Sequence, residues 1–314
     1  MRAAIFSCLG LGDGLISLVL SNNLAKNGWD VTTFHPSLNG LQTWFPHLPI
    51  ASFPSLDKME EAFSQFDRFF IFYEKSERML RTLSFCKEHW PGKVTVLNPI
   101  ATSRCDYPYW EGGKFDGRQP FVQNLVAFCR DSMQLSAVTA SNGISLPSSA
   151  VLGRHPKRIV IHPKSSNEHK NWPWEKFAAL AKGLEQEGFD PWFALSAEEK
   201  KTAPSCRCPD IANLSDLAHF IAESGAMIGN DSGIGHLASC LGLPTVTICR
   251  HKQASLFWRP AWTAGTVLTP PKWMPNLKGM RWRDKYWKHF ISVRSVANAF
   301  RDLYSPHNSC PKNS

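Results

Sequence analysis

The sequence predicts an α/β protein with two successive parallel-sheet units. Short apolar segments typical of buried strands alternate with segments of helical periodicity, and the alternation restarts after turn-forming residues at 139–157. The 314 residues, 43% of them hydrophobic, are enough chain for two ordinary domains. We therefore expect an N-terminal domain over 1–145, a C-terminal domain over 146–292, a helix at 293–305 and a polar tail at 306–314.

The first half contains four segments with the composition of buried strands, at residues 2–9, 29–34, 68–73 and 93–97. The first of them ends in a glycine-rich run. Leucines at mostly helical spacing follow and predict a helix that ends near Asn27. Because strands and helices alternate, the strands are expected to form a parallel sheet covered on both faces.

The second half repeats this pattern. Strands are expected at 158–162, 191–195, 226–228 and 245–249, and helices at about 173–187, 215–223 and 233–241. A last amphipathic segment near 295–304 predicts the final helix. Each half therefore predicts one α/β unit.

Composition excludes several classes of protein. Charged residues make up 19% of the chain, without the bias of a coiled coil or a low-complexity sequence. The longest apolar stretches, such as 15–20, are far shorter than the roughly 20 residues of a membrane-spanning helix. The nine cysteines are scattered and odd in number, which fits a reducing cytoplasm. Cys206 and Cys208 form a close pair, but without further ligands nearby they predict no metal site.

Positive charge is concentrated in one segment. Residues 250–294 hold ten lysines and arginines against the single acid Asp284, so this segment carries the whole formal net charge of +9. It also contains five of the twelve tryptophans. Such a mixture suits anionic surfaces, namely phospholipid headgroups, phosphorylated glycolipids or nucleic acid. The alternative is a solvated basic face whose tryptophans belong to the core.

The strongest local signal covers residues 228–244. A strand ends there in a polar turn and a helix begins, whose first backbone amides have no partner within the helix and therefore attract phosphate. Ser232 and Gly233 would let these amides approach a diphosphate, and His236 lies about one turn into the helix. The alternative is that Asp231 or Ser232 caps the helix and that the histidine faces the core.

The second signal is the polar loop at residues 163–173, which follows a predicted strand and precedes a predicted helix. The loop is rich in hydroxyl, amide and cationic groups. Lys164 and Lys170 within it are candidates for neutralising a diphosphate leaving group. The alternative is that both are ordinary solvated lysines.

The third signal is the loop at residues 10–14, at the carboxyl end of the first strand, where open α/β sheets bind ligands. Its glycine spacing is GxGxG rather than GxGxxG, and no acidic residue ends the second strand, so a dinucleotide-dependent dehydrogenase is not expected. Asp13 is a carboxylate where a phosphate-binding loop would not have one. It is a candidate general base toward an attacking hydroxyl, or alternatively a helix cap.

Together, these three segments resemble glycosyltransferase family 9, the heptosyltransferases that build the inner core of bacterial lipopolysaccharide. That family combines a Gly-Asp near its amino terminus with a His-Pro and Lys-x-Trp-Pro loop and a Gly-Asn-Asp-Ser-Gly-x-x-His stretch. Here the corresponding residues are Gly12-Asp13, His162-Pro163 with Lys170-Asn-Trp-Pro173, and Gly229-Asn-Asp-Ser-Gly-Ile-Gly-His236. Their order and spacing agree over most of residues 1–250.

The resemblance implies a GT-B fold, with two Rossmann-like domains facing across a cleft and a C-terminal helix that packs back on the N-terminal domain. It also implies inverting, metal-independent transfer of a sugar, usually heptose from ADP-heptose, to a lipopolysaccharide core or related glycan, with no cofactor. Asp13 then resembles the base that deprotonates the acceptor hydroxyl, and Lys170 the cation that offsets the diphosphate charge. The remaining donor-binding positions are Glu198 near the nucleotide ribose, and Asp231, Ser232, Gly233 and His236 at the helix start.

The acceptor side departs from the family pattern and is marked weakly. Gly14 follows Asp13 where the family has an apolar residue, and no proline follows in the helix, so altered packing is expected there. Arg104, Lys114 and Arg118 are candidates for binding an anionic sugar such as Kdo. Segment 250–294 is the candidate surface for phosphorylated glycolipid or anionic membrane, which implies a cytoplasmic protein with peripheral contact at the inner face of the membrane.

Two other functions remain open from the sequence. A catalytically silent sugar-nucleotide-binding or scaffold protein of the same fold would keep the binding residues without turnover. Nucleic-acid binding through segment 250–294 would use the same basic and aromatic residues, but no recognised nucleic-acid module accompanies them, so no nucleic-acid partner is expected.

Overall fold

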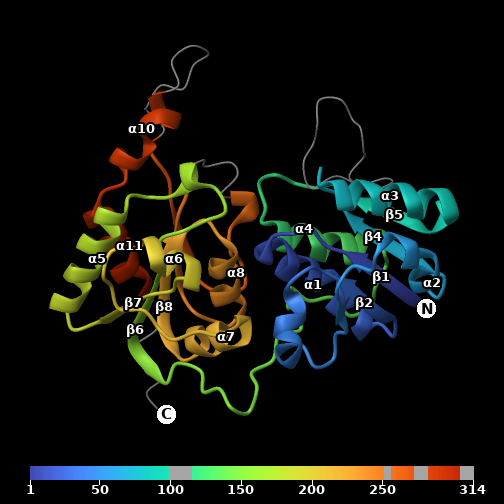
Figure 1. Cartoon of the computed structure of the whole chain (residues 1–314), viewed down its shortest axis with the longest axis horizontal. Helices are drawn as coiled ribbons and strands as arrows, with labels where there is room; N and C mark the ends of the chain where they lie inside the picture. Colours follow the sequence, from blue (N-terminus) through green and yellow to red (C-terminus); the bar gives the residue numbers. More distant parts are fainter. Residues whose placement is uncertain (99–114, 251–255, 272–281, 305–314) are drawn as a thin grey trace. The chain divides into compact units, whose positions relative to one another are not determined.

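The chain divides into two compact units, Met1–Ser145 and Leu146–Ser314. The computed structural model describes residues 1–98, 115–250, 256–271 and 282–304. Each unit contains a five-stranded parallel sheet with helices packed on it (Figure 1). This architecture confirms the expected α/β class.

The sheet of the first unit has the order β3-β2-β1-β4-β5. Its strands are β1 (Arg2–Phe6), β2 (Asp30–Phe34), β3 (Ile50–Ala51), β4 (Arg68–Phe72) and β5 (Val94–Leu97). Four of them lie where the sequence predicts strands, whereas β3 is too short to have a hydrophobic period. The strand order reverses between β1 and β4, and ligands of open α/β sheets bind at such a switch point.

The described residues of the first unit also form four α-helices and several short helical segments, among them the 3-10 helix η1 (Leu38–Trp44). The helices are α1 (Leu11–Lys26), α2 (Met59–Phe63), α3 (Glu77–His89) and α4 (Phe121–Ala127). Helix α1 is buried on every side from Gly14 to Leu24 and packs against β2, α4 and η1. The side chains of Asn22, Asn23 and Asn27 donate hydrogen bonds to backbone carbonyls of residues 137–141. These bonds attach the turn-rich segment to the first unit.

Phenylalanine rings form much of the core of the first unit. Phe6 stacks on Phe34 with ring centroids 5.0 Å apart and meets Phe63 edge-on at 4.9 Å. The ring of Phe69 from β4 joins the same cluster. Because these rings come from β1, β2, α2 and β4, their burial holds α2 against the sheet.

The sheet of the second unit has the order β10-β9-β8-β6-β7. Its strands are β6 (His155–His162), β7 (Asp190–Phe193), β8 (Ser224–Asn230), β9 (Thr245–Ile248) and β10 (Gly265–Leu268). The helices are α5 (Trp174–Gln186), α6 (Ala197–Thr202), α7 (Leu214–Ala222), α8 (Gly233–Cys240), α10 (Trp282–Phe290) and α11 (Val293–Tyr304), with the 3-10 helix η5 at Glu168–Lys170. Here the strand order reverses between β6 and β8, which makes the carboxyl ends of these strands the expected ligand site.

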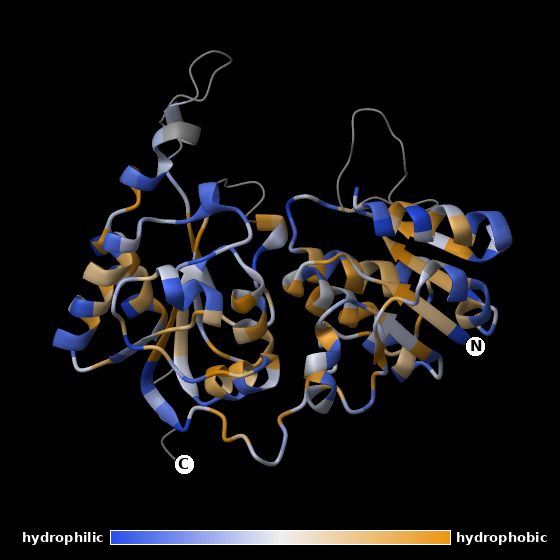
Figure 2. Ribbon diagram, in the orientation of Figure 1, coloured by the Kyte–Doolittle hydropathy of each residue, from blue (hydrophilic) through white to orange (hydrophobic). Residues whose placement is uncertain are grey.

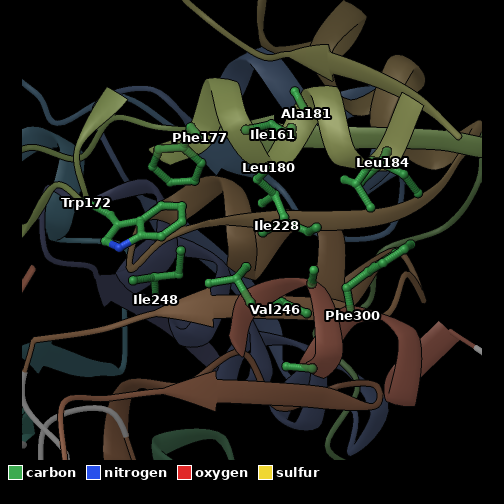
Figure 3. Packing of buried hydrophobic residues seen from close by; sticks show 14 of the residues in the cluster. Ile161, Trp172, Phe177, Leu180, Ala181, Leu184, Ile228, Val246, Ile248 and Phe300 are labelled. Carbon is green, nitrogen blue, oxygen red and sulfur yellow. The ribbon is translucent and has the colours of Figure 1, made fainter. Parts of the chain in front are cut away.

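Helix α11 packs in the core of the second unit. Its buried Val296 and Phe300 join the cluster that Ile161, Trp172 and Phe177 form with β8 and β9 (Figure 3). The guanidinium of Arg301 also pairs with the carboxylate of Glu187, at the end of α5. The helix lies close to its predicted bounds, and its apolar face packs on α5, β9 and β10.

Hydropathy follows the layers of strands and helices within each unit. Figure 2 shows hydrophobic residues on the strands and on the helix sides that face them, and hydrophilic residues on the outer sides of the helices. No helix in the described ranges is both long and apolar enough to span a membrane. The thiol sulfurs of Cys206 and Cys208 are 3.3 Å apart, and no group of three or more His, Cys, Asp or Glu side chains in the described part of the chain could hold a metal ion.

Candidate functional site

The first group of candidate residues lies where α1 begins, directly after β1. Gly10 is the N-cap residue of α1, and its carbonyl accepts a hydrogen bond from the Gly14 amide at 2.9 Å. Asp13 lies in the first helical turn, half-buried, and its carboxylate folds back over Gly10 so closely that a Cβ at Gly10 would collide with it. The positive end of the helix dipole stabilises a carboxylate at this position.

Glu74 is a second carboxylate at the same end of the sheet, and it was not singled out from the sequence. It follows β4, the strand across the switch point, where its carboxylate accepts hydrogen bonds from the Leu9 amide at 3.2 Å and the Ser76 hydroxyl at 2.6 Å. Burial raises the pKa of the Cys8 thiol well above its ordinary value, and the charges of Asp13 and Glu74 raise it further. The switch point of the first unit is therefore negatively charged.

Of the three predicted acceptor residues, Arg118 is the one that lies within the described part of the chain. Arg104 and Lys114 lie outside the described residues. The guanidinium of Arg118 pairs with the carboxylate of Asp116 at 3.0 Å, and its side chain is 90% exposed. Nothing in this local pairing distinguishes Arg118 from an ordinary surface arginine.

In the second unit, Asn230 joins the two polar loops that the sequence singled out. The residue is buried at the end of β8. Its Oδ1 accepts a hydrogen bond from the Trp172 amide at 3.0 Å, and its Nδ2 donates to the Pro163 carbonyl at 2.6 Å. Lys170 is thereby brought to Asp231, with Nζ and Oδ2 3.6 Å apart. Lys170 and Asp231 were both predicted as site residues, whereas the bridging role of Asn230 was not.

The start of α8 has the features of an anion site. Ser232 is the N-cap residue in extended conformation, but its side chain makes no capping hydrogen bond within the described residues. Its Oγ is buried and has no hydrogen-bond partner within the described part of the chain. The first amides of α8, beginning with Gly233, are thus left available to an anion at the positive end of the helix dipole.

His236 is one turn further into α8 and is almost fully buried, at 5% exposure. Burial lowers the pKa of His236 to about 4, so the imidazole is neutral near pH 7. Its ring lies edge-on to Trp262, with centroids 6.1 Å apart. His236 therefore contributes a neutral ring beneath the helix start rather than a cation.

A cavity of about 310 Å³ opens beside the start of α8. Its walls are largely apolar, and it is lined by His162, Ala194, Leu195, Ser196, Ala197, Glu199, Ile211, Ala212, Asn213, Leu214, Leu217 and Ile234. The Nδ1 of His162 donates to the Ala194 carbonyl at 2.8 Å, and burial lowers the pKa of this histidine, so its Nε2 is left as a hydrogen-bond acceptor.

Glu199 lines this cavity, whereas Glu198, the residue predicted from the sequence, does not. Glu199 is the third residue of α6, and its Oε2 accepts a hydrogen bond from the Ser196 amide in a capping box. The side chain of Glu198 is 80% exposed and pairs with Lys201 at 2.6 Å. One residue along a helix turns the side chain by about 100°, which is enough to move it out of the cavity.

Several known proteins resemble this chain in sequence and in fold. The family model of glycosyltransferase family 9 (heptosyltransferase) matches residues 116–279, slightly more than half of the chain. Lipopolysaccharide heptosyltransferase 3 of Escherichia coli K12 is 27% identical over 157 residues, which cover 45% of this chain and 44% of that protein. Lipopolysaccharide heptosyltransferase 1 of Campylobacter coli is 32% identical over 117 residues, which cover 31% of this chain and 32% of that protein.

Both curated relatives are thus matched over less than half of their length. Among solved structures, the ADP-heptose lipopolysaccharide heptosyltransferase II of E. coli has the same fold over nearly all of both chains. The alignment covers 98% of this chain and 100% of that one, with a TM-score of 0.67 and 16% identity. This likeness confirms the GT-B fold class. With the family model matching more than half of its residues, the chain belongs to glycosyltransferase family 9, the heptosyltransferase family.

Proposed function

We propose that this protein is a glycosyltransferase that transfers heptose from ADP-heptose to a hydroxyl of a lipopolysaccharide core or related glycan. Family membership and the heptosyltransferase relatives support the reaction class. One observation carries the proposal: the uncapped start of α8 lies beside both a lysine and a cavity with apolar walls. A nucleoside diphosphate needs this combination, because its base is flat and largely apolar while its diphosphate is anionic.

The cavity is the proposed nucleoside site. Ile234, in the first turn of α8, lines it, so a nucleoside bound there has its phosphates directed to the helix start. The carboxylate of Glu199 and the Nε2 of His162 are hydrogen-bond acceptors that can receive ribose hydroxyls or a base amino group. The apolar walls, including Leu195 and Leu217, would cover the faces of the base.

The diphosphate would bind the amides that follow Ser232 and the ammonium group of Lys170. Negative charge grows on the diphosphate as its bond to the sugar breaks, so a fixed cation and fixed dipoles favour the transition state more than the ground state. Asp231 keeps Lys170 at the helix start in the absence of donor, with Nζ and Oδ2 at 3.6 Å. We propose that these groups provide the charge compensation without a metal ion.

Asp13 is the proposed general base. It would take the proton of the acceptor hydroxyl while the hydroxyl oxygen forms a bond to the anomeric carbon. The bond from that carbon to the diphosphate oxygen breaks in the same step, and its electron pair leaves with the ADP. A single displacement of this kind inverts the anomeric configuration.

Turnover separates this enzyme from a silent nucleotide-sugar-binding or scaffold protein of the same fold. The test is ADP release by the purified protein with ADP-heptose and a lipopolysaccharide core acceptor. Asp13→Asn is expected to lower kcat by about 10² to 10⁴, because a general base typically contributes that much. Asp30→Asn is the matched control, since Asp30 pairs with Arg2 at the amino end of β2. No turnover by the unmodified protein with any nucleotide sugar would favour the silent protein, and full activity of Asp13→Asn would remove Asp13 as the base.

We also propose that α10 contacts anionic lipid. Trp282, Tyr286 and Phe290 are four residues apart, share one face of α10 and are 54%, 42% and 39% exposed. Trp287 projects from a different side of α10 and is buried, and its indole donates to the His169 carbonyl at 3.3 Å. Aromatic residues favour the interfacial zone of a bilayer, and the net charge of +9 in segment 250–294 supplies attraction to anionic headgroups.

A further inference from the structure

His35 lies directly beneath the start of α1 and is completely buried. It follows β2, the strand beside β1, and its own amide donates to the Ala51 carbonyl at 2.9 Å. The Nε2 of its ring is 3.2 Å from the Gly10 carbonyl oxygen. The Nδ1 is 3.1 Å from each of the amide nitrogens of Ser37 and Leu38.

These contacts determine where the ring proton is. Both amides can only donate, so Nδ1 must be the unprotonated acceptor nitrogen. The proton is therefore on Nε2, which donates to the Gly10 carbonyl. Burial also lowers the pKa of His35, in agreement with a neutral ring. The histidine thus makes two separable kinds of contact, one to the loop after β2 and one to the start of α1.

The Gly10 carbonyl belongs to the N-cap residue of α1. Its oxygen accepts two hydrogen bonds, the first of the helix from the Gly14 amide and another from the Nε2–H of His35. The absence of a side chain at Gly14 makes room for the histidine: a Cβ there would lie 2.8 Å from His35 Nε2 and 2.6 Å from a methyl carbon of Leu38. The glycine that departs from the family pattern is therefore matched to the buried histidine.

We propose that His35 is a positioning residue for the transfer reaction: by holding the Gly10 carbonyl it fixes the first turn of α1 and hence the carboxylate of Asp13. This inference rests on the proposed role of Asp13 as the base. His35 does not touch substrate and exchanges no proton with it. A displacement of about 1 Å in a reacting group can cost on the order of a hundredfold in rate, so the hydrogen bond to Gly10 matters for kcat.

Two conservative substitutions separate the two contacts. In His35→Gln the side-chain amide reaches the position of Nε2 and can donate to Gly10, but the acceptor near Nδ1 is lost. In His35→Asn the side-chain oxygen can replace Nδ1 as the acceptor for Ser37 and Leu38, but the donor to Gly10 is lost. A role limited to folding the loop after β2 predicts that Asn is the better replacement, whereas positioning of Asp13 predicts that Gln is.

We expect His35→Asn to lower kcat by about 10- to 100-fold with little change in the KM for the donor, and His35→Gln to restore most of the loss. ADP affinity and the thermal unfolding midpoint are measured for each variant to verify folding, and the exposed His47→Asn is the control. Combining His35→Asn with Asp13→Asn is expected to add no further loss of kcat, because the histidine acts through the aspartate.

Equal or better kcat in His35→Asn than in His35→Gln would overturn the proposal. A multiplicative loss in the double variant would also overturn it, since His35 would then act independently of Asp13. Failure of the proposed function gives a different result: Asp13→Asn alone would keep full turnover, whatever the His35 variants do.

Discussion

Glu198 and Glu199 illustrate how much depends on a single residue position. Resemblance to the family predicts that Glu198 lies near the nucleotide ribose. In the folded chain Glu199 lines the cavity and Glu198 pairs with Lys201 in solvent. The phase of α6 is set by its capping box at Ser196, and this cap fixes which of two adjacent glutamates faces inward.

We expect Glu198 and Glu199 to differ in their contribution to nucleotide affinity. Glu199→Gln keeps the capping hydrogen bond, because Gln also serves at this position, but it removes the charge and one acceptor oxygen. We expect the Kd for ADP to rise about tenfold, as hydrogen bonds to a charged group contribute about 1.5–3 kcal/mol. Glu198→Gln is the matched control and should leave the Kd unchanged. Isothermal titration with ADP, UDP, GDP and dTDP measures both effects, and a preference for UDP or dTDP would contradict the ADP-sugar donor.

His236 predicts how stability depends on pH. Burial lowers its pKa to about 4 in the folded protein, whereas an unfolded chain has a histidine pKa near 6.5. Between these values only the unfolded state binds the proton, so the free energy of unfolding falls as the pH drops through this window, by up to about 3 kcal/mol. The pKa values of His35 and His162 are also lowered by burial and act in the same direction.

Urea denaturation at pH 7.5 and pH 5 tests this expectation. His236→Asn removes one titrating group and should reduce the loss of stability at the lower pH, even if the variant is less stable at both. The exposed His47→Asn should show the same pH dependence as the unmodified protein. An unchanged pH dependence in His236→Asn would show that another group dominates.

At the residue scale, local sequence patterns single out some candidate site residues and miss others. Asp13, Lys170 and Asp231 are recognisable because each follows a strand and belongs to a short motif. Glu74 and His35 follow other strands of the first sheet, and their relation to Asp13 exists only once β2, β1 and β4 are side by side. Sequence neighbours cannot reveal a contact that the strand order creates.

At the scale of elements, α11 shows which structural properties helical periodicity predicts and which it does not. The spacing of Val296 and Phe300 predicts an amphipathic helix and identifies its buried face. It does not identify the surface that covers this face, because any apolar surface of matching shape satisfies the pattern. In the folded chain this face packs on α5, β9 and β10, which belong to the same unit.

Two helical glycines, Gly14 in α1 and Gly183 in α5, are expected to respond oppositely to substitution by alanine. Gly14→Ala places a methyl group against His35 and Leu38, which are buried and cannot move away freely, so we expect a loss of about 1–3 kcal/mol in the free energy of unfolding. Gly183, within α5, has open space around its Cα, so Gly183→Ala should stabilise the protein by about 0.5–1 kcal/mol through helix propensity.

Urea denaturation of Gly14→Ala and Gly183→Ala measures these changes in the free energy of unfolding. Gly14→Ala should also lower kcat without weakening ADP binding, since the proposed nucleoside cavity belongs to the second unit. A Gly14→Ala variant as stable and active as the unmodified protein would mean that α1 can shift without cost, and that the tight fit against His35 has no role.

At the scale of the whole molecule, α10 combines contacts to the Lys170 turn with an exposed aromatic face. Its buried side holds the turn that carries Lys170, through Trp287 to the His169 carbonyl and through Lys288 Nζ to the Glu168 carbonyl at 3.4 Å. Its other face exposes the aromatic residues proposed to meet lipid. A glycolipid acceptor is embedded in a membrane, so a lipid-binding helix next to the donor-binding turn would bring the donor to the acceptor's surroundings. The sequence identifies a basic segment with several aromatic residues. Which of them are buried, as Trp287 is, and which are exposed, as Trp282 is, becomes known only from the folded helix.

Binding to phospholipid vesicles tests this arrangement. The unmodified protein should sediment with vesicles that contain phosphatidylglycerol at low salt, less so at high salt, and hardly with phosphatidylcholine alone, because screening weakens attraction between exposed charges. Replacing Trp282, Tyr286 and Phe290 with serine should reduce sedimentation even at low salt, since charge alone then holds the protein on the surface. The matched control replaces the exposed Leu80, Leu146 and Leu152 with serine. If the aromatic triple variant binds as well as this control, α10 is not the lipid-binding element, and if neither charge nor salt alters sedimentation, the basic segment is only a solvated face.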